Sequence, residues 1–88
     1  MKQFSATIID PIGLHARPAS ELVKLAATFV SDVKIISQGR SGNAKSILNV
    51  MALGVKQGQE ITIEVSGADE ETAVAKIEAE LKNLKLIA

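Results

Sequence analysis

Apolar residues alternate with polar ones in three stretches of the chain, and this spacing of two predicts strands. The alternating residues are Phe4, Ala6 and Ile8 in the first stretch, Val33 and Ile35 in the second, and Ile61, Ile63 and Val65 in the third. The first two stretches end at the turn-forming segments Asp10–Gly13 and Ser37–Gly39. Arg40–Asn43 is predicted as a short return strand, although it has almost no residues that favour β structure.

A spacing of three to four residues replaces this alternation elsewhere and predicts helices. The first helix begins near Ala16 and has Pro18 in its first turn, where a missing N–H is no loss. The second covers Ile47–Leu53, between Ser46 as a suitable N-cap and Gly54 as a suitable end. The repeating residues are Ala19, Leu22, Val23, Ala26 and Val30 in the first helix and Ala73, Ile77, Leu81 and Leu84 in a third helix, which opens at Asp69.

The predicted order of elements is β-α-β-β-α-β-α. Because the clear strands are apolar on one face only, they do not suit a parallel sheet buried on both faces. We therefore expect an α+β fold in two layers, with a four-stranded antiparallel sheet and three helices on one of its faces. The chain has 88 residues without a repeat, a linker or a low-complexity tract, so residues 1–88 are expected to form a single domain.

Composition argues against several classes of function. Ten basic residues balance ten acidic ones, and Phe4 and Phe29 are the only aromatic residues, so no nucleic-acid partner is expected. With no cysteine and one histidine, neither a disulfide nor a zinc site is expected, and no cofactor is implied. The N-terminus lacks a signal-peptide pattern, and no apolar run approaches the ~20 residues of a membrane span. We expect a soluble cytoplasmic protein without a membrane partner.

The single histidine, His15, is the main candidate for chemistry. It precedes the first predicted helix, where the backbone N–H groups of Ala16 and Arg17 and the helix dipole favour an anion. No neighbouring serine, cysteine or carboxylate offers an obvious hydrolytic partner in this segment. Imidazole is a nucleophile in its own right, and the helix start and Arg17 could hold a phosphoryl group placed on it. The alternative is a surface or capping histidine with no task.

Arg17 and Ser46 each have a structural and a functional interpretation. Arg17 is either a solvated arginine or the partner of an anion that would offset its unfavourable place near a helix N-terminus. Ser46 most simply caps the second helix, but an N-cap hydroxyl is also a place where an added phosphate is electrostatically favourable. Asn49 is a poor capping-box partner for Ser46, since Glu or Gln is preferred there.

The helix Ile47–Leu53 is apolar on nearly all sides. If Val50 and Leu53 face the core, Ile47, Leu48 and Met51 remain largely outside and form an apolar docking patch. Deeper burial of the whole helix is the alternative.

Two segments resemble the signature segments of one protein family. Gly13–Ser20 reads GLHARPAS and Asn43–Gly54 reads NAKSILNVMALG, and both are closely similar to segments of HPr proteins. These are the histidine-containing phosphocarriers of the bacterial phosphoenolpyruvate–sugar phosphotransferase system. Length and element order are similar over essentially the whole chain. The resemblance implies an open-faced β-sandwich, which agrees with the two-layer fold.

The resemblance also implies a role for each candidate residue. His15 matches the histidine that accepts a phosphoryl group on Nδ1 from phospho-enzyme I and passes it to the A domain of a sugar permease. Arg17 matches the arginine that assists this transfer. Ser46 matches a regulatory serine that an HPr kinase/phosphorylase modifies. Such a protein carries a phosphoryl group within a relay and is not itself an enzyme.

For docking, Ile47, Leu48 and Met51 match the apolar surface that successive partners of the family share. Lys24 and Lys45 are expected to form its cationic rim against acidic partners. A monomer is expected.

The sequence leaves two other functions possible. One is a regulator of the same fold in a nitrogen-linked relay, although the context Lys45-Ser46-Ile47 favours the sugar system. The other is a small ligand-binding or interaction domain in which His15 is incidental. An RNA-binding sheet is disfavoured by the strands, which are poor in aromatic residues.

Overall fold

The computed structural model describes all 88 residues, and its helices and strands follow the order expected from the sequence. The strands are β1 (Lys2–Thr7), β2 (Asp32–Ser37), β3 (Arg40–Asn43) and β4 (Glu60–Ser66). The helices are α1 (Ala16–Ala26), α2 (Ile47–Ala52) and α3 (Glu70–Asn83). None of the three helices is both long and apolar enough to cross a lipid bilayer.

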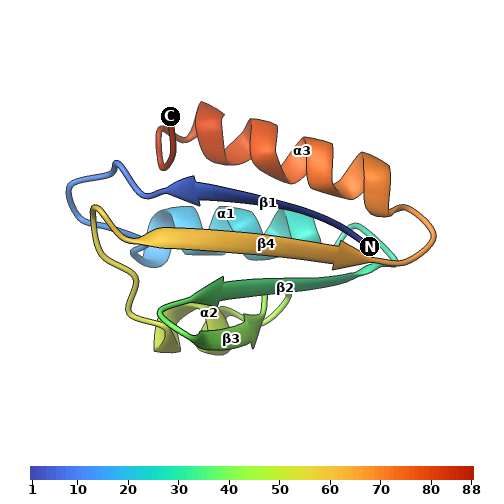
Figure 1. Ribbon diagram of the computed structural model, residues 1–88, viewed down its shortest axis with the longest axis horizontal. Helices are drawn as coiled ribbons and strands as arrows, with labels where there is room; N and C mark the ends of the chain where they lie inside the picture. Colours follow the sequence, from blue (N-terminus) through green and yellow to red (C-terminus); the bar gives the residue numbers. More distant parts are fainter.

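The strands form one antiparallel sheet in the order β1-β4-β2-β3 (Figure 1). Strand β4 lies between β1 and β2, so Ile63 is opposite Phe4 on one side and Ile35 on the other. These apolar side chains meet across the strands and contribute one wall of the core. The expected four-stranded antiparallel sheet is confirmed.

The short return strand β3 is confirmed as well, although its residues have low β propensity. A two-residue turn joins it to β2, and in this turn Gln38 and Gly39 have φ of 56° and 73°. Positive φ at both positions is typical of a type I′ hairpin, whose twist matches that of the strands. The turn places Ser37 opposite Arg40 and so sets the register. Turn geometry therefore compensates for weak propensity in this strand.

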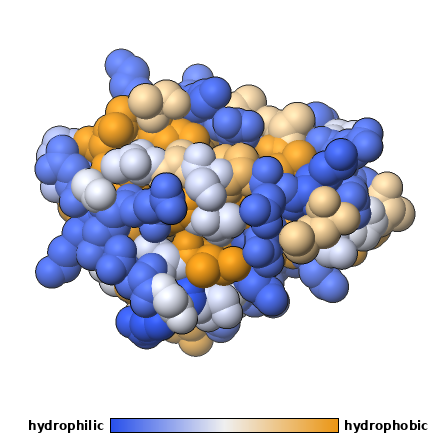
Figure 2. All heavy atoms as spheres, in the orientation of Figure 1, coloured by the Kyte–Doolittle hydropathy of each residue, from blue (hydrophilic) through white to orange (hydrophobic).

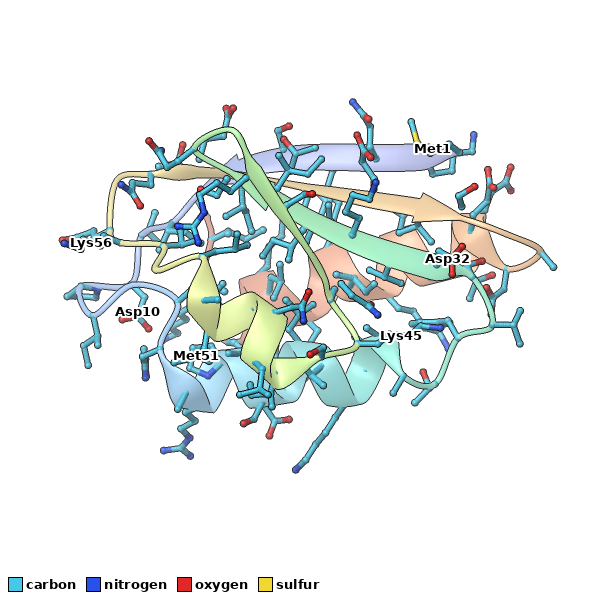
Figure 3. The ribbon with its side chains drawn as sticks, turned by 90° about the horizontal axis from the view of Figure 1, so that it is seen from below. Met1, Asp10, Asp32, Lys45, Met51 and Lys56 are labelled. Atoms are coloured by element: carbon cyan, nitrogen blue, oxygen red, sulfur yellow. The ribbon has the colours of Figure 1, made fainter.

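All three helices pack against the same face of the sheet, as the view from below shows (Figure 3). Along β4, Ile61, Ile63 and Val65 are completely buried under the helices, whereas Thr62 and Glu64 alternate with them and are partly exposed. The uncovered face of the sheet is mainly hydrophilic, with apolar patches between the polar side chains (Figure 2). The expected two-layer α+β arrangement is confirmed.

The end of the first helix differs from the prediction. Helix α1 stops at Ala26, and Val30, which the helical spacing included, is 77% exposed in the loop before β2. The Asp69 carboxylate accepts hydrogen bonds from the Val30 and Ser31 backbone N–H groups, both at 3.0 Å, and from the Ser31 hydroxyl. These donors, the Ser31 hydroxyl above all, hold the pKa of Asp69 below its usual range. Asp69 thus fastens the loop after α1, and its side chain does not cap α3.

The end of α3 also differs. Leu84 was expected in the buried stripe, but it is only half-buried, at the C-cap of the helix. The chain then turns back, and the N–H groups of Leu86 and Ile87 both donate to the Leu81 carbonyl. Leu86 and Ile87 are buried, and the Leu86 carbonyl accepts from the Ile9 N–H at 2.8 Å. At this end of the chain the buried apolar residues are therefore Leu86 and Ile87, beyond the helix, rather than Leu84.

Candidate functional site

His15 lies at the end of a tight turn that follows β1. Asp10 forms this turn, because its Oδ1 accepts from the Ile12 N–H at 2.9 Å and its backbone carbonyl accepts from the Gly13 N–H at 2.9 Å. The His15 N–H then donates to the Gly13 carbonyl at 3.0 Å. Successive hydrogen bonds therefore fix the backbone that leads to His15, outside any strand or helix.

The two residues before His15 anchor this turn to the core. Leu14 is buried, and its N–H donates to the Val55 carbonyl at 3.0 Å. Gly13 has φ of +84°, and a Cβ at this position would lie 2.6 Å from the Val55 carbonyl oxygen. Only glycine fits such a close approach at positive φ. While Leu14 is fixed in the core, the His15 side chain remains 32% exposed.

His15 is the N-cap residue of α1, but its side chain does not cap the helix. Its backbone is extended, with φ of −91° and ψ of −178°, and its carbonyl accepts from the Ala19 N–H at 3.0 Å. The N–H groups of Ala16 and Arg17 have no acceptor within the protein, and Pro18 has no N–H to donate. Two free N–H groups therefore remain at the start of α1, beside the imidazole, where an anion is favoured.

Asp10 lies closer to His15 than the sequence suggested. Its Oδ2 is 3.4 Å from His15 Nε2, and the two side chains are 20% and 32% exposed. In the sequence Asp10 counts as a turn former, and no carboxylate stands out as a partner for His15. One signal for this contact was available in the sequence. An aspartate precedes a turn that contains glycine, and the turn leads to the histidine.

Arg17 is exposed on the first turn of α1, as expected. Its guanidinium makes no hydrogen bond and no ion pair within the protein. The side chain is therefore free to bind an anion near the start of its own helix.

Ser46 caps α2 as predicted. Its Oγ accepts from the Asn49 N–H at 3.3 Å and from Asn49 Nδ2 at 3.0 Å. The Ser46 N–H donates to the Asn43 carbonyl, so Asn49 does not complete a capping box. Asn49 Oδ1 instead accepts from the Asn43 N–H at 3.3 Å, which ties α2 to the end of β3.

The outward face of α2 is apolar, as the docking interpretation requires. Val50 and Leu53 are buried, whereas Leu48 is 79% exposed, Met51 40% and Ile47 37%. Figure 3 shows Met51 at the end of α2 that faces the turn carrying Asp10, and Lys45 at the opposite end. We call Ile47, Leu48 and Met51 the α2 patch.

The two lysines expected at the rim of this patch differ in their freedom. Lys24 is 77% exposed, and its Nζ lies 3.8 Å from Glu21 Oε1 in a solvated pair. Lys45 is half-buried, and its Nζ donates to the Phe29 carbonyl at 2.8 Å. The Lys45 ammonium is therefore engaged in holding the loop after α1, while the Lys24 ammonium is exposed to solvent.

A hollow of the surface lies away from His15. It has a volume of about 560 Å³ and is lined mainly by polar residues of β2, β3 and β4 and of the start of α2, among them Lys34, Asn43 and Glu64. His15 lies on an open surface beside a helix end. Such a site suits a group that a large partner must reach directly.

The comparisons with known proteins agree with this arrangement. The family model for the PTS HPr component phosphorylation site matches residues 2–83. The phosphocarrier protein HPr of Mycoplasma genitalium is 50% identical over 88 residues, which cover 99% of this chain and 100% of that protein. A solved histidine-containing phosphocarrier protein of Mycoplasma is 48% identical and superimposes with a TM-score of 0.96 over 98% of both chains.

A dimer occurs among the solved relatives. HPr of Thermoanaerobacter tengcongensis, which is 36% identical with a TM-score of 0.72 over the whole of both chains, is described as a dimer.

The family match over residues 2–83, together with an open-faced sheet that has three helices on one face, identifies the class of protein as a phosphocarrier of the phosphotransferase system. The chain belongs to the HPr family.

Proposed function

We propose that His15 is the residue that carries the phosphoryl group, accepted from phospho-enzyme I and passed to the A domains of sugar permeases. The observation that carries this proposal is the place of the imidazole. It is partly exposed at the start of α1, next to the free N–H groups of Ala16 and Arg17. No other histidine is present in the chain to take this role.

The open surface suits a relay. A carrier must release its phosphoryl group as readily as it accepts it, so strong binding in a deep pocket would slow the second transfer. Two free N–H groups and one arginine give moderate stabilisation to the phosphoryl oxygens. The exposed ring leaves the phosphorus open to attack by the next acceptor.

Partner recognition is assigned to the α2 patch. Leu48 and Met51 offer exposed apolar area, Met51 at the end of α2 that faces the turn carrying Asp10 (Figure 3), and Lys24 adds an exposed cation on α1. Two partners that must each approach His15 would cover the same side of the molecule. Lys45 contributes less charge to this rim than Lys24, because its ammonium is engaged with the Phe29 carbonyl.

Ser46 is the proposed site of regulation by an HPr kinase/phosphorylase. A phosphate on its hydroxyl would lie at the start of α2, beside Ile47 of the patch. Phosphoserine carries about −1.5 to −2 charges at neutral pH, which a helix N-terminus tolerates but an acidic partner would not. We propose that the protein acts in the cytoplasm as a monomer and without a cofactor.

Labelling with phosphoenolpyruvate and enzyme I tests the central assignment. The protein should gain an acid-labile, alkali-stable phosphate, and His15→Ala should gain none while remaining folded. Label that persists in His15→Ala would show that another residue is the acceptor. Sedimentation of the same samples measures the oligomeric state, and a stable dimer would contradict the proposed monomer.

A further inference from the structure

We propose that Asp10 is a positioning residue, which holds the His15 imidazole in the tautomer with its proton on Nε2. This inference rests on the proposed function, because it assigns a state to the residue that accepts the phosphoryl group. Asp10 Oδ2 lies 3.4 Å from His15 Nε2. Nδ1, the other ring nitrogen, makes no hydrogen bond within the protein.

The turn itself orients the Asp10 carboxylate. Oδ1 is engaged with the Ile12 N–H at 2.9 Å, which leaves Oδ2 toward the ring. The separation of 3.4 Å exceeds the ~2.9 Å of a formed N–H···O bond. Catalytic pairs are often long before the substrate arrives and tighten in the complex.

A carboxylate fixes the tautomer because its oxygens only accept hydrogen bonds. The nitrogen that faces Oδ2 is therefore the one that carries the N–H. A neutral imidazole has one N–H, so Nδ1 keeps its lone pair. Nδ1 is bonded to Cγ and is the ring nitrogen nearer the backbone, where the free N–H groups of Ala16 and Arg17 begin α1.

The transfer step then needs no loss of a proton from His15. The Nδ1 lone pair attacks phosphorus, the N–P bond forms, and the bond from phosphorus to the donor breaks with its electron pair remaining on the donor. The Nε2 proton stays in place, so the phosphorylated ring is positively charged. The Asp10 carboxylate faces that charge and stabilises it, and the onward transfer reverses these steps.

The variant Asp10→Asn isolates this effect. Its amide oxygen can still accept from the Ile12 N–H, but an NH₂ group replaces Oδ2 and presents a donor to the ring. Nε2 must then accept, which moves the proton to Nδ1 and blocks the nucleophile. The same exchange lowers the rate about 10⁴-fold in a buried catalytic triad, and for this partly exposed pair we expect about tenfold or more.

Asp10→Ser is the matched control. A serine hydroxyl can accept from the Ile12 N–H in a similar turn. Its side chain is one atom shorter, so it carries neither the second carboxylate oxygen nor an amide group toward His15. Asp10→Ser should therefore lose the bias in tautomer without inverting it, and its rate should fall between those of the unaltered protein and Asp10→Asn.

Two measurements decide the question. Nitrogen-15 NMR of the His15 ring reports the tautomer in the unphosphorylated protein, and phosphoramidate, a small donor that needs no docking, gives the rate of phosphorylation. We expect Nε2–H in the unaltered protein, Nδ1–H in Asp10→Asn, and the slowest phosphorylation in Asp10→Asn. An unaltered protein with Nδ1–H, or an Asp10→Asn variant with the normal tautomer and rate, would overturn the inference.

The proposed function fails in a different way. In that case His15 would show the expected tautomers, and phosphoramidate would modify it, but phospho-enzyme I would not. Such a result would support the effect of Asp10 on the ring and reject the relay.

Discussion

The turn before His15 makes Gly13 the most informative position for a stability test. In Gly13→Ala, alanine must adopt φ of +84°, and left-handed geometry costs an L-residue about 1–2 kcal/mol. The new Cβ would lie 2.6 Å from the Val55 carbonyl oxygen, about 0.8 Å inside the 3.4 Å at which ordinary contact begins. Forced displacement of this kind costs roughly 1–3 kcal/mol. The sum is about 2–5 kcal/mol, and even the lower value should reduce Tm by about 8–16 °C.

Urea denaturation followed by circular dichroism measures this effect, and Gly39→Ala is the control. Gly39 also has positive φ, +73°, but nothing lies within 4 Å of a Cβ there. Gly39→Ala should therefore lose only the conformational part, about 1–2 kcal/mol. Equal destabilisation of the two variants would show that the close contact with Val55 has no energetic weight.

Four further outcomes are expected. Asp69→Asn should destabilise the protein more at pH 7 than at pH 3, because the lowered pKa of Asp69 provides stability above the unfolded value of about 3.9 and loses it as the pH falls through the folded value; an equal difference in unfolding free energy between variant and unaltered protein at both pH values, measured by urea titration, would contradict this. Leu48→Ser should raise the KM for phosphorylation by enzyme I with stability within about 0.5 kcal/mol, whereas Val30→Ser, exposed to 77% against 79% for Leu48, should leave KM unchanged. Arg17→Ala should keep its Tm but slow transfer by the equivalent of about 2–4 kcal/mol of barrier, and an equal rate in single-turnover assays would remove Arg17 from the mechanism. Ser46→Asp should bind enzyme I more weakly at near-normal stability, since aspartate caps a helix as well as serine; calorimetry showing full-strength binding would reject the electrostatic explanation.

Those parts of the fold that depend on local periodicity could be predicted from the sequence. The alternation in β4 is enough to assign its buried face, and the spacing in α2 separates Val50 inside from Leu48 outside. His15 stands out because a turn, a lone imidazole and a helix start coincide in consecutive residues. The N-cap of α2 could be predicted as well, because Ser46 directly precedes the apolar run of the helix.

Contacts between distant segments could not be predicted in this way. Val30 fits the helical spacing of α1, but Asp69, 39 positions away, removes it from the helix by binding its N–H. The sequence predicts Lys45 as a cation at the rim of the patch, yet its ammonium donates to a carbonyl on another loop. Asp10 is near His15 in the sequence, but their contact depends on the curvature of the turn between them. Periodicity carries no information about such geometry.

The separation between the reactive ring on the loop before α1 and the exposed apolar side chains on α2 has a consequence for how such relays diversify. A substitution at Leu48 or Met51 does not remove the contact between Asp10 and the imidazole, so a partner can be changed while that contact is kept. Parallel relays within one cell could then be insulated from one another by complementary changes at α2 and its partners. An engineer who wants an orthogonal pair would vary α2 and keep the turn from Asp10 to His15 constant.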